Sequence, residues 1–217
     1  KANEEKSGDI LAGVAAGSMS ERVAAKEVLS NLLLSDLRNN PVVAYEDDDV
    51  TQIIQDNVNE YVYDSIKNWS VSEFREWLLD NANNEYEINK IRPGLTSEMI
   101  SAVTKIMSNM DLVYASSKME VTAHCNTTIG GRGVLAARLQ PNHTTDSIKG
   151  ITASALEGLS YGVGDAVIGL NPVNDTVDSV TRVLNRFYEI KTELEIPTQT
   201  CVLAHITTQI EAIKAGA

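Results

Sequence analysis

Arg138 and Gln140 are the residues of this sequence whose types and spacing best suit chemistry. They follow the apolar run 133–137, and Pro141 ends the segment. In a β-strand, successive side chains point to opposite faces, so residues two positions apart share a face. A guanidinium and a carboxamide would therefore project together from the carboxyl end of a buried strand. Both can donate hydrogen bonds to the same ligand oxygen, and the guanidinium adds a fixed positive charge.

The same pattern, an apolar run followed by a polar residue, recurs twice further along the chain. Residues 166–170 run into Asn171 and Pro172, and residues 201–204 run into His205. Positions 138, 171 and 205 are separated by 33 and 34 residues, which is close to the roughly 30 or more residues of a βαβ unit. We therefore predict three successive βα units, with helices that begin near residues 144–146 and 175–176.

Apolar strands that alternate with amphipathic helices predict an α/β fold, in which helices cover a parallel sheet. Right-handed crossovers would bring all three polar strand ends to one edge of that sheet. A doubly wound sheet and a (β/α)8 TIM barrel both bind ligands at this edge. The glycine fingerprint of a dinucleotide-binding fold is missing, which favours the barrel. Eight βα units need roughly 260 residues and only about 85 follow Gly133, so we expect a truncated barrel.

The first half of the chain has the periodicity of helices. We divide the sequence into a helical N-terminal region, residues 1–110, and three βα units of a barrel, residues 111–217. Capping boxes at Ser18–Glu21 and Ser70–Glu73 mark two helix starts. The apolar residues that recur at helical spacing are expected to pack in a core. Examples are Val23, Val28, Val50, Ile53, Phe74, Ile100 and Val103.

Three short motifs invite a ligand-binding interpretation that their spacing does not support. The acidic run 46–49 lacks the alternating ligands of a calcium loop, and it suits the N-terminus of the next helix. His124 and Cys125 are adjacent but have no matching second pair, so we assign them a structural role. The glycines of 130–133 are not followed by the Lys-Ser/Thr of a phosphate loop. We predict no metal ligand in the chain.

Composition excludes several classes of partner. The net charge is −12, and the 18 Lys and Arg residues are scattered along the chain, so we predict no nucleic-acid partner. No apolar run approaches the roughly 20 residues that span a bilayer, so we predict no membrane partner. Cys125 and Cys201 are far apart and form no disulfide framework, which favours a reducing compartment. The chain opens on Lys1 rather than Met, so we expect residues upstream.

Two segments resemble the large subunit of ethanolamine ammonia-lyase: residues 137–142 (ARLQPN) and 167–173 (VIGLNPV). The resemblance extends over essentially the whole chain, in long stretches without gaps. These further stretches are residues 7–16, 38–42, 158–169 and 201–213.

The resemblance implies an adenosylcobalamin-dependent enzyme that converts ethanolamine to acetaldehyde and ammonia by a radical route. It also implies a (β/α)8 barrel with an N-terminal helical extension, a small subunit that binds cobalamin, and a homo-oligomer of large subunits. The implied location is the cytoplasm, within a bacterial microcompartment. By this resemblance, Arg138, Gln140 and Asn171 contact the hydroxyl region of the substrate, and Pro172 contacts cobalamin. The carboxylates that hold the substrate ammonium would lie beyond Ala217, so residues 1–217 alone are expected to be inactive.

Simpler roles remain open for each of these residues. Arg138 could form a structural ion pair inside the barrel, while Gln140 and Asn171 could satisfy the backbone at the strand ends. His205 suits a core or supporting position better than a ligand contact. Two alternative functions are another TIM-barrel lyase or aldolase, and a non-catalytic helical interaction module in residues 1–110. An aldolase needs a Schiff-base lysine, and none ends these three strands.

Overall fold

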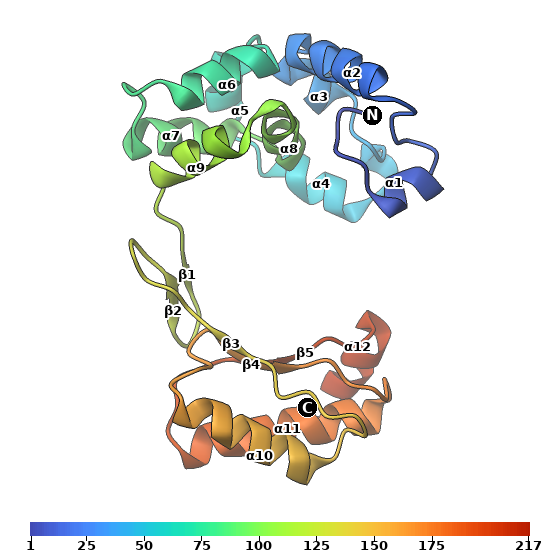
Figure 1. The fold of residues 1–217 in the computed structure, drawn as a ribbon, viewed down its shortest axis with the longest axis vertical. Coiled ribbons are helices and arrows are strands. Elements are labelled where there is room, and N and C mark those ends of the chain that lie inside the picture. The colour runs from blue at the N-terminus through green and yellow to red at the C-terminus, as the bar shows by residue number, and fades with distance from the viewer. The chain divides into compact units, whose positions relative to one another are not determined.

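A computed structural model describes residues 1–217, which form two compact units: an N-terminal unit, Lys1–Met119, and a C-terminal unit, Glu120–Ala217 (Figure 1). No helix in the chain has both the length and the apolar character needed to cross a membrane. The N-terminal unit consists of helices and two 3₁₀ turns. They are α1 (Ser7–Leu11), α2 (Met19–Asn31), α3 (Leu34–Asn39), η1 (Tyr45–Asp47), α4 (Asp49–Asp56), α5 (Glu60–Ile66), α6 (Val71–Leu79), α7 (Glu85–Ile91), η2 (Arg92–Gly94), α8 (Ser97–Ile106) and α9 (Asn109–Ser117).

Side-chain caps mark the starts of most of these helices; α1 and α3 begin without one. Ser18 accepts a hydrogen bond from the Glu21 N–H at the start of α2, but the Glu21 carboxylate accepts from the Gly17 N–H, so the predicted capping box is only half formed. Ser70 and Glu73 form a complete capping box at the start of α6. In the acidic run, Asp48 caps α4 through Thr51, whose hydroxyl and N–H lower the pKa of the carboxyl group. The interpretation of this run as a helix N-terminus is confirmed.

The core of the N-terminal unit lies between α3, α5, α6 and α8. Its fully buried side chains include Leu34, Phe74 and Met99. The prediction that every periodic apolar residue would pack in a core is wrong for several positions. Val23 and Val28 of α2 are each 64% exposed. Periodicity identifies an apolar helix face, but it does not supply the partner that would cover that face. The other exposed positions are Val50, Ile53 and Ile100.

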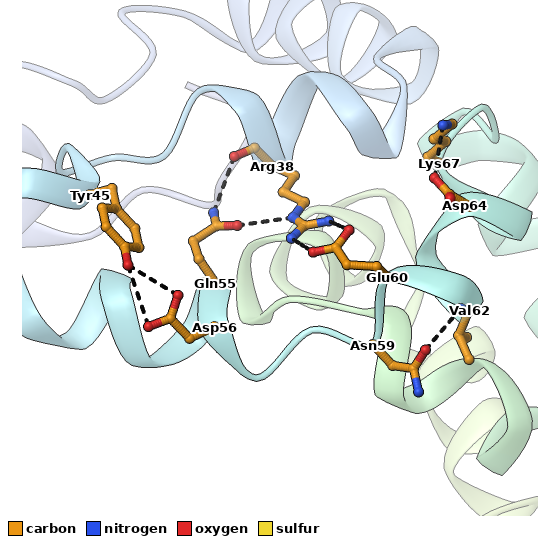
Figure 2. A network of polar contacts seen from close by, with 9 residues as sticks. All are labelled: Arg38, Tyr45, Gln55, Asp56, Asn59, Glu60, Val62, Asp64 and Lys67. Atoms are coloured by element: carbon orange, nitrogen blue, oxygen red, sulfur yellow. Dashed lines mark hydrogen bonds and ion pairs between the residues drawn. The ribbon is translucent and has the colours of Figure 1, made fainter.

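A polar network around Arg38 ties α3 to α4 and α5 (Figure 2). The guanidinium donates to Gln55 Oε1 at 3.0 Å and makes a bidentate ion pair with Glu60. Its Cζ atom also lies 4.2 Å from the ring centroid of Tyr63. The Glu60 carboxylate raises the pKa of Arg38 above its ordinary value, although burial opposes this shift. All three guanidinium nitrogen atoms therefore donate to protein acceptors, and one face of the group lies against the Tyr63 ring.

The C-terminal unit combines two small sheets with three helices. Its elements are β1 (Thr122–His124), β2 (Thr128–Gly130), β3 (Arg138–Leu139), α10 (Ile148–Ser160), β4 (Val167–Leu170), α11 (Val177–Glu193), β5 (Thr200–Val202) and α12 (Ile206–Lys214). Strands β3, β4 and β5 form a parallel sheet in sequence order, while β1 and β2 form an antiparallel hairpin. The predicted succession of parallel βα units is confirmed.

Helices α10 and α11 pack on one face of the parallel sheet (Figure 1). Leu139 lies opposite Ile168 in the register, and Leu170 lies opposite Val202. All four side chains belong to the core that contains Phe187 of α11. Since strand residues alternate between faces, Arg138, Gly169 and Cys201 lie on the other face of the sheet. We call this surface the open face.

Strand β3 is shorter than the sequence predicted. The apolar run 133–137 was expected to form the first part of a buried strand, but Val134 and Leu135 are 57% and 96% exposed. Pairing with β4 starts only at Val167, so the earlier residues have no partner strand. Ala137 extends the contact through its O atom, which accepts from the Ala166 N–H. The structure is mixed helix and strand with small sheets, and closure into a barrel remains a prediction.

The hairpin β1–β2 covers the amino ends of β4 and β5. Gln199, which precedes β5, accepts from the Asn126 N–H at 3.0 Å and donates to Thr127 Oγ1 at 2.7 Å. The Thr127 hydroxyl donates to the Asp165 carbonyl oxygen. His124 and Cys125 are exposed in this hairpin. The amino end of the sheet is therefore blocked by the chain itself, while the carboxyl end carries the candidate residues.

Candidate functional site

The candidate site is the carboxyl edge of the parallel sheet, which we call the rim. It consists of the loops after β3, β4 and β5, residues 140–147, 171–176 and 203–205. Because the three strands are parallel and adjacent, their carboxyl ends meet at this edge. Gln140, Asn171 and His205 follow their strands here, as predicted from the spacing.

Arg138 lies on the open face of the sheet. A Cβ atom placed on Gly169 would lie 3.0 Å from Arg138 Nη2 and 2.5 Å from Cys201 Sγ. The guanidinium therefore occupies the space that the missing side chain of Gly169 leaves on β4. It makes no hydrogen bond or ion pair with any of residues 1–217. The structural ion pair, which was the simpler role for Arg138, is not formed within these residues.

Gln140 and Asn171 present exposed side chains at the rim. Neither carboxamide satisfies the backbone of a strand end. That role belongs to Asn142, whose Oδ1 accepts from the Asn171 N–H at 2.9 Å. The alternative role of Gln140 and Asn171 as backbone partners is therefore wrong for this structure. Their amide groups, together with the Arg138 guanidinium, form a set of polar groups that are free to bind a ligand.

Pro172 is half-buried beside Asn171, and the next residue, Val173, is 67% exposed. Proline has no N–H, so this position of the loop adds an apolar ring without adding a donor. The loop after β4 thus places a polar side chain next to an apolar surface. A ligand at this edge would meet both kinds of contact.

His205 is exposed and caps α12, so a core position is wrong for it, whereas a supporting role agrees with the cap. Its Nδ1 accepts from the Thr207 N–H at 3.3 Å and lies 2.8 Å from Thr207 Oγ1. The backbone N–H of His205 donates to Asp175 Oδ2 at 2.8 Å. Nδ1 is thereby engaged in the cap, and Nε2 is the ring atom that remains available.

Asp146 is the rim residue whose role the sequence did not reveal. We expected Thr144, Thr145 or Asp146 to cap the following helix, but the N-cap of α10 is Ser147, and its side chain makes no capping bond. The Asp146 carboxylate instead accepts backbone N–H groups of the loop after β4. No local signal could have revealed this, because the donors lie 27 and 28 residues further along the chain.

Comparison with known proteins identifies the family of this chain. A sequence model of the family described as ethanolamine ammonia lyase large subunit (EutB) matches residues 1–217. The chain belongs to this family. The resemblance carried by segments such as 137–142 and 167–173 is thereby confirmed.

Individual members of the ethanolamine ammonia-lyase large-subunit family match along the entire chain. The large subunits from Escherichia coli (strain K12) and Salmonella typhimurium (strain LT2) are each 58% identical over 217 residues, which is 100% of this chain and 48% of the relative. The chain thus spans about half the length of the curated relatives it matches. The activity of the whole family protein is therefore a proposal for this chain.

Proposed function

We propose that this chain is part of an ethanolamine ammonia-lyase large subunit, which converts ethanolamine to acetaldehyde and ammonia by an adenosylcobalamin-dependent radical route. Strands β3, β4 and β5 would be the first strands of a (β/α)8 barrel, with the N-terminal helices as its extension. The observation that carries the proposal is the Arg138 guanidinium, unpaired on the open face of the sheet whose rim carries the exposed side chains of Gln140 and Asn171.

Arg138, Gln140 and Asn171 would hold the hydroxyl region of ethanolamine. A guanidinium has five N–H donors and stays protonated in proteins, so it can stabilise charge on the substrate oxygen without releasing a proton. The carboxamides add neutral donors and acceptors that fix the orientation of the substrate. The ammonium end requires anionic partners, and the family resemblance places those carboxylates beyond Ala217.

The apolar surface at Pro172 and Val173 fits one side of a large macrocycle such as cobalamin. Pro172 would contact the cofactor, and no metal ligand is required from these residues because cobalt enters within its own ring. When bound, adenosylcobalamin supplies an organic radical through cleavage of its cobalt–carbon bond. The protein's contribution is to hold the substrate at the rim and to keep water from the reacting carbon atoms.

Other parts of the proposal follow from the family. The word "large" in the relatives' names supports a small-subunit partner. The exposed apolar faces of α2 and α4 support association with further large subunits. We place the enzyme in the cytoplasm, within a bacterial microcompartment.

Two variants of the full-length large subunit, assayed with the small subunit, test this division of roles. Asn171→Ala should raise the KM for ethanolamine about 10-fold, as expected for loss of one hydrogen bond worth about 1.4 kcal/mol. The affinity for cobalamin should change little. Pro172→Phe should weaken cobalamin binding and leave the substrate KM nearly unchanged once the cofactor is saturating. Equal losses of cobalamin affinity in both variants would contradict the assignment, as would acetaldehyde formation by residues 1–217 alone.

A further inference from the structure

The loop after β3 contains a buried carboxylate that the proposed reaction does not use. Asp146 is only 6% exposed. Its Oδ1 accepts from the Val173 N–H at 3.0 Å, and its Oδ2 accepts from the Asn174 N–H at 2.7 Å. Oδ2 also lies 3.4 Å from the hydroxyl of Ser179 in α11. All three donors belong to the loop after β4 or to the helix that follows it.

No cation offsets the charge of Asp146, since its partners are two amides and one hydroxyl. A buried carboxylate is costly unless hydrogen bonds satisfy it, so these donors must stay in place while the carboxylate remains charged. The backbone donors in turn depend on the carboxylate for their position. The carboxylate fixes Val173 and Asn174, the two residues that directly follow the substrate-binding Asn171 and the cofactor-binding Pro172 of the proposed function.

Asn142 adds a second link on the other side of Pro172. Its Oδ1 accepts from the Asn171 N–H, so side chains from the loop after β3 hold the segment 171–174 at both ends. The N–H of Asp146 also donates to the His143 carbonyl oxygen at 3.2 Å, which closes a turn between the two anchoring residues. The loop after β3 therefore acts as a brace for the loop after β4.

The backbone of Asp146 adopts an uncommon conformation. Its φ is 50°, in the left-handed region that glycine adopts most readily. Aspartate tolerates this region better than most residues, and it persists there when the surrounding structure holds it, as the hydrogen bonds of its carboxylate do here. At this position, glycine would relieve the backbone but would remove the carboxylate.

We propose that Asp146 is a positioning residue for the reaction: it sets where Asn171 and Pro172 lie at the rim. This inference rests on the proposed function and assigns a role to a residue that touches neither substrate nor cofactor. Asn171 reaches the substrate only while its backbone is anchored on either side. A shift of about 1 Å in a binding group can cost as much as 100-fold in rate.

The test uses the full-length large subunit with its small subunit and adenosylcobalamin. Asp146→Asn keeps the size of the side chain but directs an NH₂ group at one of the two backbone N–H donors. We expect kcat/KM for ethanolamine to fall about 10-fold. The matched control is Asp178→Asn on the exposed surface of α11, where the carboxylate only pairs with Arg182 and kcat/KM should not change.

A double-mutant cycle distinguishes positioning from general loss of structure. In an Asn171→Ala background with adenosylcobalamin at saturation, Asp146→Asn should lower kcat/KM by less than about 2-fold, because Asn171, the substrate-binding group that it positions, is already gone and a displaced Pro172 then affects only cofactor affinity. Multiplicative losses in the cycle, or normal kcat/KM in folded Asp146→Asn, would overturn the inference. Normal kcat/KM in Asn171→Ala would instead overturn the substrate role of Asn171 in the proposed function.

A second variant keeps the test informative even where Asp146→Asn does not fold. Asn142→Ala removes only the acceptor for the Asn171 N–H and leaves the buried carboxylate satisfied. It should reproduce the loss in kcat/KM with a smaller change in Tm, and its effect should also shrink in the Asn171→Ala background. An unchanged kcat/KM in folded Asn142→Ala would count against the brace.

Discussion

Two arginines show how differently the two units of this chain use a guanidinium. In the N-terminal unit, Arg38 is bound to Gln55 and Glu60 and lies against the ring of Tyr63. In the C-terminal unit, Arg138 lies on the open face of the sheet over Gly169, without a hydrogen-bonding or ionic partner among residues 1–217. The first side chain is 13% exposed and joins three helices. The second is anchored only by the shape of the strand beneath it.

The contrast teaches which arginine stabilises the fold and which is available to a ligand. A guanidinium whose donors are all engaged cannot bind a substrate without first losing protein contacts. One whose donors are free of protein partners can bind a ligand without losing protein contacts. Changes at Arg38 should therefore alter stability, whereas changes around Arg138 should alter catalysis.

Gly169 offers the strongest way to disturb the Arg138 side of this comparison without removing the charge. In Gly169→Ala, the new methyl group would lie 2.5 Å from Cys201 Sγ and 3.0 Å from Arg138 Nη2. The Cys201 Sγ atom must move and the guanidinium must give way by a few tenths of an ångström, so we expect kcat/KM in the full-length enzyme to fall about 10-fold. Gly158→Ala is a poor control because its methyl group would lie 2.3 Å from Leu139 Cδ1. Gly8→Ala serves instead, because no atom lies within 4 Å of the added methyl group. Unchanged kinetics in Gly169→Ala would show that the position of Arg138 does not matter.

Arg38→Ala should lower stability and leave catalysis unchanged, the opposite of the result expected for Gly169→Ala. Loss of the Tyr63 contact and the Gln55 hydrogen bond should lower the free energy of unfolding by about 1 to 2 kcal/mol, while the folded enzyme keeps its kcat/KM. Unfolding of residues 1–217 followed by tryptophan fluorescence reports the stability, because Trp69 and Trp77 are the only two tryptophans in these residues and both lie in the N-terminal unit. The kcat/KM is measured on the full-length enzyme. A normal unfolding curve of Arg38→Ala combined with a lowered kcat/KM would show that Arg38 serves catalysis and not stability, contrary to this comparison.

Acid should destabilise the N-terminal unit by protonating Asp111, which pairs with the Arg75 guanidinium as Glu60 pairs with Arg38. The Ser108 N–H and then the Arg75 guanidinium lower the pKa of Asp111 below its ordinary 3.8. A carboxylate whose pKa is lowered by folding stabilises the protein above its unfolded pKa, and that stability is lost as pH falls through the folded pKa. We expect a small loss of stability below about pH 4, which Asp111→Asn reduces. Unfolding curves followed by tryptophan fluorescence at pH 6 and pH 3 provide the check, and an identical pH dependence in Asp111→Asn would count against this contribution.

The elements that local sequence controls could be predicted. Ser18 and Ser70 mark helix starts because their caps involve residues only three positions away. The parallel βα succession follows from apolar strands at regular spacing. The positions of Gln140 and Asn171 at one edge follow from parallel pairing alone.

Features that depend on a partner distant in sequence could not be predicted. The residues before Arg138 look like strand, but pairing starts only where β4 provides a neighbour. Asp146 resembles a helix cap until its donors at Val173 and Asn174 are seen. Val23 has the period of a core residue, yet no element of the chain covers it. In each case the missing information is tertiary.

The central claim, that Arg138 acts on a ligand through directed donors, is tested most directly by kcat/KM and Tm of Arg138→Lys and Arg138→Ala in the full-length enzyme. Lysine keeps the charge but loses the planar donor set. We predict a loss of about 10-fold or more for lysine, a cost of about 1.4 kcal/mol or more in the transition state, and a further loss for alanine. Tm should change little in either variant. Near-normal kcat/KM in folded Arg138→Ala, together with a lowered Tm, would contradict the claim.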